Sequence, residues 1–425
     1  MNTFFCRAFQ CCFAVGARFL PWRTPEVFSG EGSLLRAADI LRENGLRRPF
    51  VIASRRQCAD EHFRALQEKL DEQDILLSIF SSVEPNPSVE TVEKIAAQYK
   101  IDSCDCFLVI GGGSPMDAAK AAAARLARPD KPLSQLAGLL KVRRRIPPLI
   151  AVPTTAGTGS ETTIAAVVTG SDHHKYAISD LCLIPRYAIL DPALTVGLPP
   201  HITAETGMDA LTHAVEAYLS RFYNTKQTRP LAENAVVTIF THLERAYRDG
   251  TSLPDRAAML QASFDAGAAF TRASVGNVHA IAHTLGGLYG VPHGLANAVL
   301  LPLVLEDYGK AVDAQQDEFG RATWGARLDN PPYYAACPSC RTCRPQGRHG
   351  GGARQGVHRR NPRDEYPHGH SRPLRLYPQR GHPPHGHLGR AGGKPRLPRA
   401  GHLRRSALCA RHRAFTPQPI TLSAF

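Results

Sequence analysis

The sequence predicts an α/β region followed by an all-helical region, because two different patterns follow each other along its 425 residues. From about residue 31 to 195, short apolar runs alternate with amphipathic helical segments, as in a parallel sheet covered by helices. From about residue 203 to 313, long helical segments dominate and strand signals are few. A change of composition near residue 330 sets off the last part of the chain.

Each part divides further into elements. Apolar spacing and stop signals predict helices over residues 33–45, 59–70, 88–100 and 116–126. Short buried strands are expected over residues 50–53, 75–80, 106–110 and 149–152. We therefore expect an NAD(P)-binding α/β domain over residues 1–198, a truncated helical metal-binding domain over 199–330, and a low-complexity tail over 331–425.

The start of the chain and its cysteines indicate the compartment. Residues 4–20 are apolar, and we expect a buried strand or helix there rather than a targeting peptide, because no small-residue cleavage site follows. No apolar run reaches the roughly 18 residues of a membrane helix. The 11 cysteines are odd in number and form no secreted framework, so we expect a cytoplasmic protein.

The net charge of +14 lies at the C-terminus. Residues 331–425 hold 18 Lys and Arg against two acidic residues, a net of +16, which leaves −2 for residues 1–330. The same 95 residues hold nine of the 18 His and 14 of the 33 Pro, with few aliphatic side chains. Such a segment buries too little apolar surface to offset its ordering entropy, so we expect disorder.

Three explanations of this tail are open. An arginine-rich extension could bind nucleic acid through its phosphates. Cys337, Cys340 and Cys343 could bind a metal together with nearby histidines, although no fourth ligand stands at a recognised spacing. The third explanation is a shifted reading frame, because GC-rich codons read out of frame yield this mixture of residues. We favour the third, and disfavour nucleic acid as a partner, since Lys394 is the only lysine there.

A glycine-rich turn follows the strand expected over residues 106–110. Its three glycines, residues 111–113, let backbone N–H groups approach a ligand without a Cβ in the way. Ser114 suits the N-cap of the next helix and Pro115 its first position, which aims a positive helix end at an anion such as pyrophosphate. The GxGxxG spacing is absent, and a plain strand-to-helix turn is the alternative.

A second loop with small and hydroxylated residues, 153–161, follows the strand expected over residues 149–152. It begins at the carboxyl end of the strand, the edge at which α/β sheets bind ligands, and its hydroxyl and N–H groups can hold phosphate or ribose. A plain Ser/Thr loop is the alternative, but two such loops after two strands favour a nucleotide site.

Histidines and one aspartate are concentrated in the helical region. Asp209 and His213 stand four residues apart on one expected helix, as do His279 and His283 on another, and His293 follows in a Pro-His-Gly turn. One carboxylate and three imidazoles make a site for Fe²⁺ or Zn²⁺. A single histidine is more often an ordinary core or surface residue, but four of the nine histidines before residue 331 fall in these motifs.

Together these motifs resemble the iron-containing (group III) alcohol dehydrogenase family. The similarity runs from about Glu26 to about residue 320 and is carried by residues 111–117, 154–161, 191–216 and 276–296. It implies a Rossmann-like nucleotide-binding domain followed by a helical metal-binding domain, the fold shared with dehydroquinate synthase. The family continues with further helices, which this chain replaces with the basic tail. We therefore hypothesise that this polypeptide is poorly folded or inactive as written.

The resemblance also implies roles for individual residues. Metal ligands are Asp209, His213, His279 and His293, and His283 matches a histidine beside the nicotinamide that could relay a proton. Cofactor-contacting positions are Ser54, Asn86, Gly112, Gly113, Ser114, Asp117, Thr154, Thr155, Gly157, Thr158 and Lys175. Ser54 stands where the family often has an acidic residue that holds the adenosine ribose. With Arg55 and Arg56 beside it, NADP becomes as credible a cofactor as NAD.

The implied reaction is hydride transfer between NAD(P) and a primary or secondary alcohol, assisted by one divalent metal, with Fe²⁺ favoured over Zn²⁺. The implied substrate is a small alcohol or aldehyde, and we expect a homo-oligomer, a dimer, with no membrane partner. Glycerol dehydrogenase-like and dehydroquinate synthase-like enzymes are alternatives within the same fold. A nucleic-acid-binding element in the tail is the alternative of another class.

Overall fold

A computed structural model describes residues 15–17, 19–170, 174–220 and 223–319, with side chains as far as residue 310. Most of the predicted opening segment, residues 4–20, and the whole tail, residues 331–425, lie outside the described residues. The described residues all belong to one compact unit of the chain.

The first half contains the predicted parallel sheet, which has six strands in the order β1-β9-β6-β4-β2-β3. The strands are β1 (Glu26–Ser29), β2 (Pro49–Ala53), β3 (Ser78–Phe80), β4 (Cys106–Gly111), β6 (Leu149–Pro153) and β9 (Tyr187–Leu190). The chain goes from β2 outward to β3 and then returns to β4 on the other side of β2. The loops after β2 and β4 therefore flank the point where the strand order reverses, which is where such sheets bind ligands.

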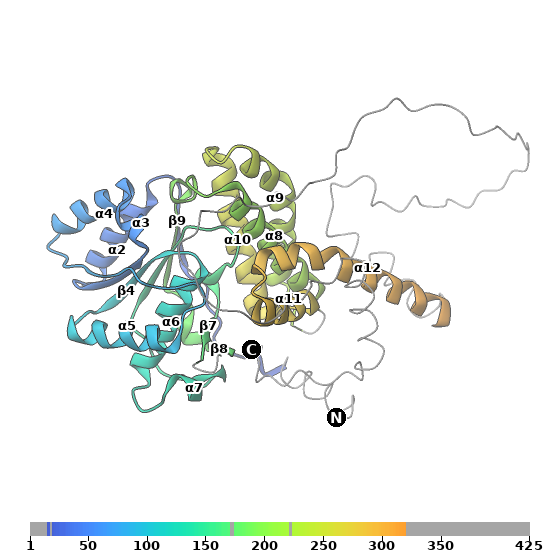
Figure 1. Ribbon diagram of the computed structural model, residues 1–425, viewed down its shortest axis with the longest axis horizontal. Coiled ribbons are helices and arrows are strands. Elements are labelled where there is room, and N and C mark those ends of the chain that lie inside the picture. The colour runs from blue at the N-terminus through green and yellow to red at the C-terminus, as the bar shows by residue number, and fades with distance from the viewer. Residues whose placement is uncertain (1–14, 18, 171–173, 221–222, 320–425) are drawn as a thin grey trace, which may run out of the picture. The chain divides into compact units, whose positions relative to one another are not determined.

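Helices cover both faces of this sheet (Figure 1). The helices α5 (Val89–Ile101) and α6 (Gly113–Ala127) pack on one face, and α2 (Arg36–Glu43) and α4 (Glu61–Asp71) pack on the other. Alternate strand residues enter the two cores, as Phe107 does on the α6 side and Leu108 on the α4 side. Because both faces are buried, the strands are continuous apolar runs.

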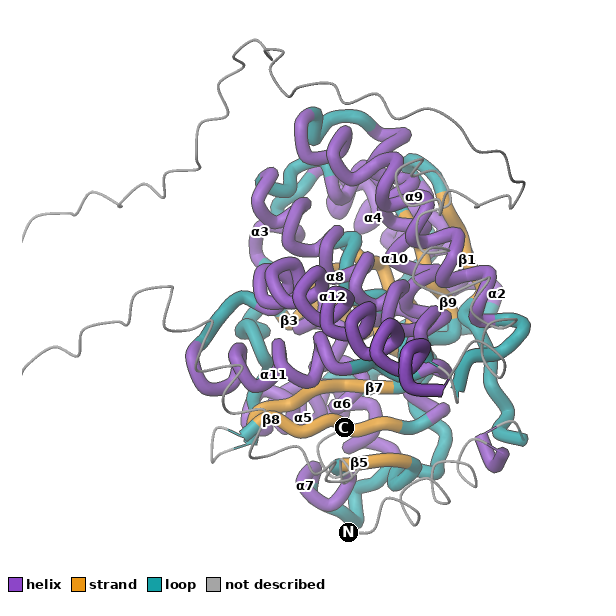
Figure 2. Tube along the Cα trace, turned by 90° about the vertical axis from the view of Figure 1, so that its right-hand side faces the viewer, coloured by secondary structure: helices purple, strands orange, loops and turns teal. Residues whose placement is uncertain are grey.

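The sequence did not predict the second, three-stranded sheet, in the order β5-β8-β7 (Figure 2). Its strands are β5 (Gly138–Leu139), β7 (Ala165–Thr169) and β8 (Lys175–Ser179), and β7 pairs with β8 in antiparallel orientation. The edge strand β1 and the strand β9 were also missed, as were the short helices α3 (Arg55–Cys58) and α7 (Leu133–Leu136). All of these elements have two to five residues, too few to show a period.

The second half is helical, as predicted. It consists of α8 (Pro200–Leu219), α9 (Thr228–Arg248), α10 (Leu253–Ala273), α11 (Asn277–Tyr289) and α12 (His293–Phe319). A core of small and aliphatic side chains joins these helices to β9. Across the described residues, none of the helices has the length and apolar character needed to cross a bilayer. The domain limits 1–198, 199–330 and 331–425 stay predictions.

Two local predictions are wrong. Gly112, in an extended conformation, is the N-cap of α6 in place of Ser114, and the Oγ of Ser114 instead accepts a hydrogen bond from the Asn86 N–H at 3.2 Å. His293 is the first residue of α12 rather than part of a turn. Gly294 follows it because a Cβ there would collide with the backbone of Glu205 in α8. Close helix packing, not a turn, therefore requires this glycine.

Candidate metal and cofactor site

The two loops after β4 and β6 lie against each other. A Cβ on Gly112 would come 3.1 Å from Thr155 Oγ1, and a Cβ on Gly113 would come 3.0 Å from Thr158 Cγ2. The glycines thus allow a close approach of backbone and loop at the N-terminus of α6. Such a Cβ-free helix start is suited to the phosphates of a dinucleotide.

Three other predicted cofactor residues meet beside this helix start. Lys175 Nζ donates a hydrogen bond to Asn86 Oδ1 at 2.7 Å, and Asn86 N–H donates to Ser114 Oγ. Asn86 has a left-handed backbone with a φ of 59°, which asparagine tolerates better than most residues. Segments far apart in sequence therefore bring an amide, a hydroxyl and an ammonium to one edge of the first loop.

Ser54 lies at the end of β2, next to the second loop. It caps α3 in a reciprocal pair with Gln57, whose Nε2 donates to Thr154 Oγ1 at 3.0 Å. Arg56 donates to the carbonyl of Gly197 at 3.2 Å, and Arg55 is exposed. No carboxylate stands at this position, as the sequence already indicated.

Asp117 differs from the other predicted cofactor residues. Its two carboxylate oxygens accept hydrogen bonds from Ser160 Oγ and from the Val167 N–H, each at 3.2 Å. Burial raises the pKa of this carboxyl to about 6, an effect that the positive charge of Lys120 opposes. Asp117 thus connects the loop after β6 to strand β7.

The predicted metal ligands converge on one oxygen. Asp209 Oδ1 lies 3.9 Å from His213 Nδ1, 3.5 Å from His279 Nε2 and 3.4 Å from His293 Nε2. The ligand atoms of Asp209, His213 and His279 all lie within 4.8 Å of one another, and these three residues are buried. The His293 side chain is 39% exposed and stands at the open side of the cluster.

The electrostatics of the cluster fit a cation. Burial alone would raise the pKa of Asp209, but the imidazoles of His213, His279 and His293 hold it well below its usual range. Burial lowers the pKa of His213 to about 3, which keeps this ring neutral, and its Nδ1 is a buried atom without a hydrogen-bond partner. A neutral imidazole with a free nitrogen beside a carboxylate is the donor set that Fe²⁺ or Zn²⁺ binds.

Two further residues of the cluster were not predicted. Glu216, on α8 with Asp209, accepts hydrogen bonds from the N–H groups of Gly276 and Val278 and from His279 Nδ1, at 2.6–2.7 Å. Asn297 on α12 is buried, and its Nδ2 lies 2.7 Å from Asp209 Oδ1. The i, i+7 spacing of Asp209 and Glu216 could have pointed to Glu216, since both lie on one helix face.

His283 lies at the edge of the cluster. Its ring centroid is 5.1 Å from that of His293 and 6.1 Å from that of His279. Partial burial, followed by the neighbouring imidazoles, lowers the pKa of His283 to about 4. The ring is therefore neutral at pH 7.

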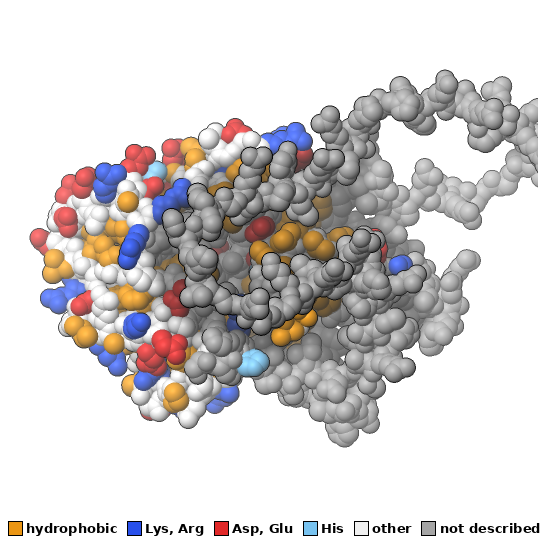
Figure 3. All heavy atoms as spheres, in the orientation of Figure 1, with side chains coloured by type: hydrophobic (Ala, Val, Ile, Leu, Met, Phe, Trp, Pro, Cys, Tyr) orange, Lys and Arg blue, Asp and Glu red, His pale blue; other side chains and the backbone are white. Residues whose placement is uncertain are grey.

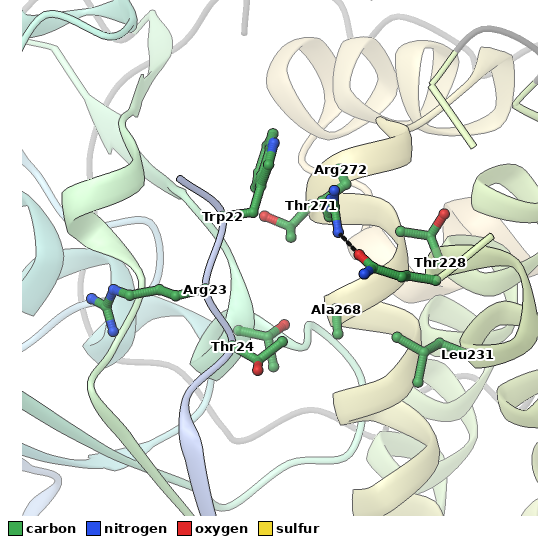
Figure 4. A pocket seen from close by; sticks show the side chains of 10 residues that line it. Trp22, Arg23, Thr24, Thr228, Leu231, Ala268, Thr271 and Arg272 are labelled. Atoms are coloured by element: carbon green, nitrogen blue, oxygen red, sulfur yellow. Dashed lines mark hydrogen bonds between the residues drawn. The ribbon is translucent and has the colours of Figure 1, made fainter. Parts of the chain in front are cut away.

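A separate pocket of about 330 Å³ lies between the segment at Trp22 and the helices α9 and α10 (Figure 4). Arg272 lies over the Trp22 ring at 5.3 Å and donates a hydrogen bond to Gln227. None of the candidate metal ligands lines this pocket.

Comparisons with known proteins identify the family of this chain. The family model of iron-containing alcohol dehydrogenase matches residues 24–192, and that of the family's C-terminal domain matches residues 203–328. The chain is 38% identical to probable alcohol dehydrogenase EutG of Escherichia coli over 307 residues, which cover 72% of this chain and 77% of EutG. It is 44% identical to 1,3-propanediol dehydrogenase of Klebsiella pneumoniae over 236 residues, 55% of this chain and 60% of that enzyme.

A solved structure of a similar protein includes the nicotinamide cofactor. Sulfoacetaldehyde reductase from Bifidobacterium kashiwanohense in complex with NAD⁺ is 31% identical and superimposes with a TM-score of 0.61, covering 68% of this chain and 76% of that one. These relatives are oxidoreductases, and the glycerol dehydrogenase-like and dehydroquinate synthase-like alternatives are not favoured. The chain therefore belongs to the iron-containing alcohol dehydrogenase family of metal-dependent, NAD(P)-dependent enzymes.

Proposed function

We propose that this chain interconverts a small primary alcohol and its aldehyde, with Asp209, His213, His279 and His293 as the metal ligands. The observation that carries the proposal is the convergence of three imidazoles, from α8, α11 and α12, within 3.9 Å of Asp209 Oδ1. Fe²⁺ is the favoured ion, and Zn²⁺ accepts the same ligands. The names of the relatives, which include propanediol dehydrogenases, support a short aliphatic substrate.

The bound metal would supply a Lewis acid for the substrate oxygen, and the nicotinamide would supply or accept the hydride. The chain's own residues position these partners. The loops at Gly112 and Thr155 receive the cofactor phosphates, and Lys175 and Asn86 line the same edge. His283, whose ring lies beside that of His293, would relay the proton that the alcohol releases.

We further propose that the protein acts as a cytoplasmic homodimer and does not bind nucleic acid. Lys and Arg side chains are interspersed with Asp and Glu on the face of the α/β half seen in Figure 3. Mixed charge of this kind supplies no extended positive field for a polyanion on that face, and the excess positive charge lies in residues 331–425, which we attribute to a shifted reading frame.

The direct test is an assay of the purified full chain, reconstituted with Fe²⁺ or Zn²⁺, against a series of straight-chain alcohols and aldehydes. We expect metal-dependent NAD(P)H formation with at least one short primary alcohol, at a rate that the altered C-terminus lowers relative to a chain whose residues 320–425 are replaced with the C-terminal segment of EutG. Turnover that does not respond to the added metal would contradict the proposed site.

Cofactor choice provides a further prediction. Because Ser54 replaces a carboxylate that would repel a 2′-phosphate, NADP⁺ is expected to give a kcat/KM at least equal to that of NAD⁺. Ser54→Asp should then lower kcat/KM for NADP⁺ by tenfold or more, roughly 1.4 kcal/mol, and spare NAD⁺. Steady-state assays with both cofactors measure this ratio. A strong preference of the unmodified chain for NAD⁺ would show that the prediction is wrong.

Glu216 gives a prediction about metal affinity. Its carboxylate fixes the His279 ring through Nδ1 and leaves Nε2 for the metal. Glu216→Gln is expected to weaken Fe²⁺ or Zn²⁺ binding by about 10–100-fold. Competition with a chromophoric chelator measures this, and Glu90→Gln, at an exposed position of α5, is the matched control. Equal affinities in all three proteins would exclude the positioning role.

A further inference from the structure

Lys120 is a fully buried charge in the middle of α6. Its ammonium donates hydrogen bonds to the backbone carbonyls of Ser160 at 2.5 Å, Thr163 at 2.9 Å and Ala165 at 3.1 Å. The hydroxyls of Ser160 and Thr163 lie 3.2 and 2.9 Å from the same nitrogen. All five oxygens belong to residues 160–165, which run from the end of the second cofactor loop to the first residue of β7.

Two acidic side chains lie close to this charge. Ser160 Oγ, a partner of the ammonium, also donates to Asp117, so a hydroxyl bridges the cation and the carboxylate. Glu161 is buried in the same region. Burial lowers the pKa of Lys120 to about 8, partly offset by Asp117 and Glu161, so the side chain stays mainly protonated at pH 7.

The same loop is packed tightly against the helical half. A Cβ on Gly157 would come 2.7 Å from Thr206 Cβ of α8, and a Cβ on Gly159 would come 2.6 Å from Gly267 Cα of α10. Gly159 also has a φ of +58°, the left-handed region that favours glycine. Helices α8 and α10 thus restrict the backbone on either side of Thr158. Lys120 donates hydrogen bonds to residues 160–165, which follow in the chain.

The hydrogen bonds of Lys120 connect helix α6 to the second cofactor loop. Residues 160–165 follow Thr155 and Thr158, the side chains that a Cβ on Gly112 or Gly113 would meet first. Helix α6, which carries Lys120, begins at those glycines. One ammonium therefore connects residues 160–165 to the helix whose start carries Gly112 and Gly113.

We propose that Lys120 is a positioning residue for the cofactor: its ammonium acts as a built-in cation that gathers the carbonyls of residues 160–165 and fixes the spacing of the two cofactor loops. The inference rests on the proposed function, because it takes these loops to be the NAD(P) site. It adds that the spacing depends on a cation among neutral oxygens. In a variant without the Lys120 side chain, an external cation should therefore take its place.

The experiment compares Lys120→Ala, Lys120→Met and the unmodified full chain, with Lys94→Ala at an exposed position of α5 as control. NADPH and NADH binding is followed by nucleotide fluorescence without substrate, so it does not depend on turnover. Amide hydrogen exchange of residues 157–165 reports loop order without cofactor. Each measurement is repeated with methylammonium chloride and with tetramethylammonium chloride at equal ionic strength.

Lys120→Ala should weaken nucleotide binding about tenfold or more and speed exchange in the loop, because several buried carbonyls lose their donor. Methylammonium should recover much of both losses in Lys120→Ala, whereas tetramethylammonium, which has no N–H donor, should not. Lys120→Met, which fills the space, should stay impaired in either salt.

Unchanged binding and exchange in Lys120→Ala would overturn the inference, and so would a loss that neither cation relieves. If Lys120→Ala does not fold, native binding and exchange in Lys120→Met would overturn it. If the unmodified chain binds no nucleotide, the proposed function fails, and the exchange data alone decide whether Lys120 fixes the loop.

Discussion

Asp209→Ala is expected to abolish stoichiometric metal binding and to lower kcat/KM by a factor on the order of 10²–10⁴. The factor corresponds to the several kcal/mol that a Lewis acid contributes to charge stabilisation in the transition state. The Oδ1 of Asp209 lies 3.5 Å from His279 Nε2 and 3.4 Å from His293 Nε2. Removing it leaves three imidazoles and no negative charge to balance a divalent cation.

Metal analysis and steady-state kinetics on the same preparations measure the effect. Asp209→Asn keeps the shape of the side chain and should lose metal nearly as completely, because the charge is removed. Asp130→Asn, on the exposed surface, is the control and should retain both metal and activity. An Asp209→Ala protein that still holds stoichiometric metal would refute the ligand assignment.

The helical spacing of these candidate site residues could be predicted from the sequence because each pair lies on one helix. Asp209 and His213 share a face of α8, and His279 and His283 share a face of α11, as the i, i+4 rule requires. The alternation of apolar runs and helices likewise predicted the central strands, since a parallel sheet buried on both faces needs such runs.

The sequence could not show which side chains from different elements would meet. Glu216 reaches across to the start of α11, and Asn297 reaches Asp209 from α12, and neither contact follows from a local period. The Pro-His-Gly sequence at His293 is typical of a turn, but Gly294 serves close packing against α8. Tertiary contacts therefore decided the details that local patterns left open.

The exposed apolar face on α11 and α12 supports the second large prediction. Leu295, Val299 and Leu303 recur every four residues on α12 and are 45%, 57% and 55% exposed. At the end of α11, Leu288 and Tyr289 are 71% and 74% exposed. Large apolar side chains grouped in this way usually contact another element.

The similarity to the family ends before a helix that could cover this face. The match to the family's C-terminal domain stops at residue 328, and the alignment covers 77% of EutG. Residues 331–425 carry a net charge of +16 and few aliphatic side chains, so they offer little apolar surface to cover the face. We hypothesise that a shift of reading frame replaced helices that would pack there.

Replacing residues 320–425 with the C-terminal segment of EutG is expected to raise the free energy of unfolding by several kcal/mol. Each leucine removed from water contributes about 1.5–3 kcal/mol, against a total of about 5–15 kcal/mol for a domain. Thermal melts, urea titrations and binding of a hydrophobic dye measure the change. A variant ending at residue 330 is the control: it lacks the positive charge but leaves the face open, so it should resemble the original chain. Cooperative unfolding and low dye binding by the original chain would instead mean that this face needs no such cover, and the frameshift hypothesis would lose its structural support.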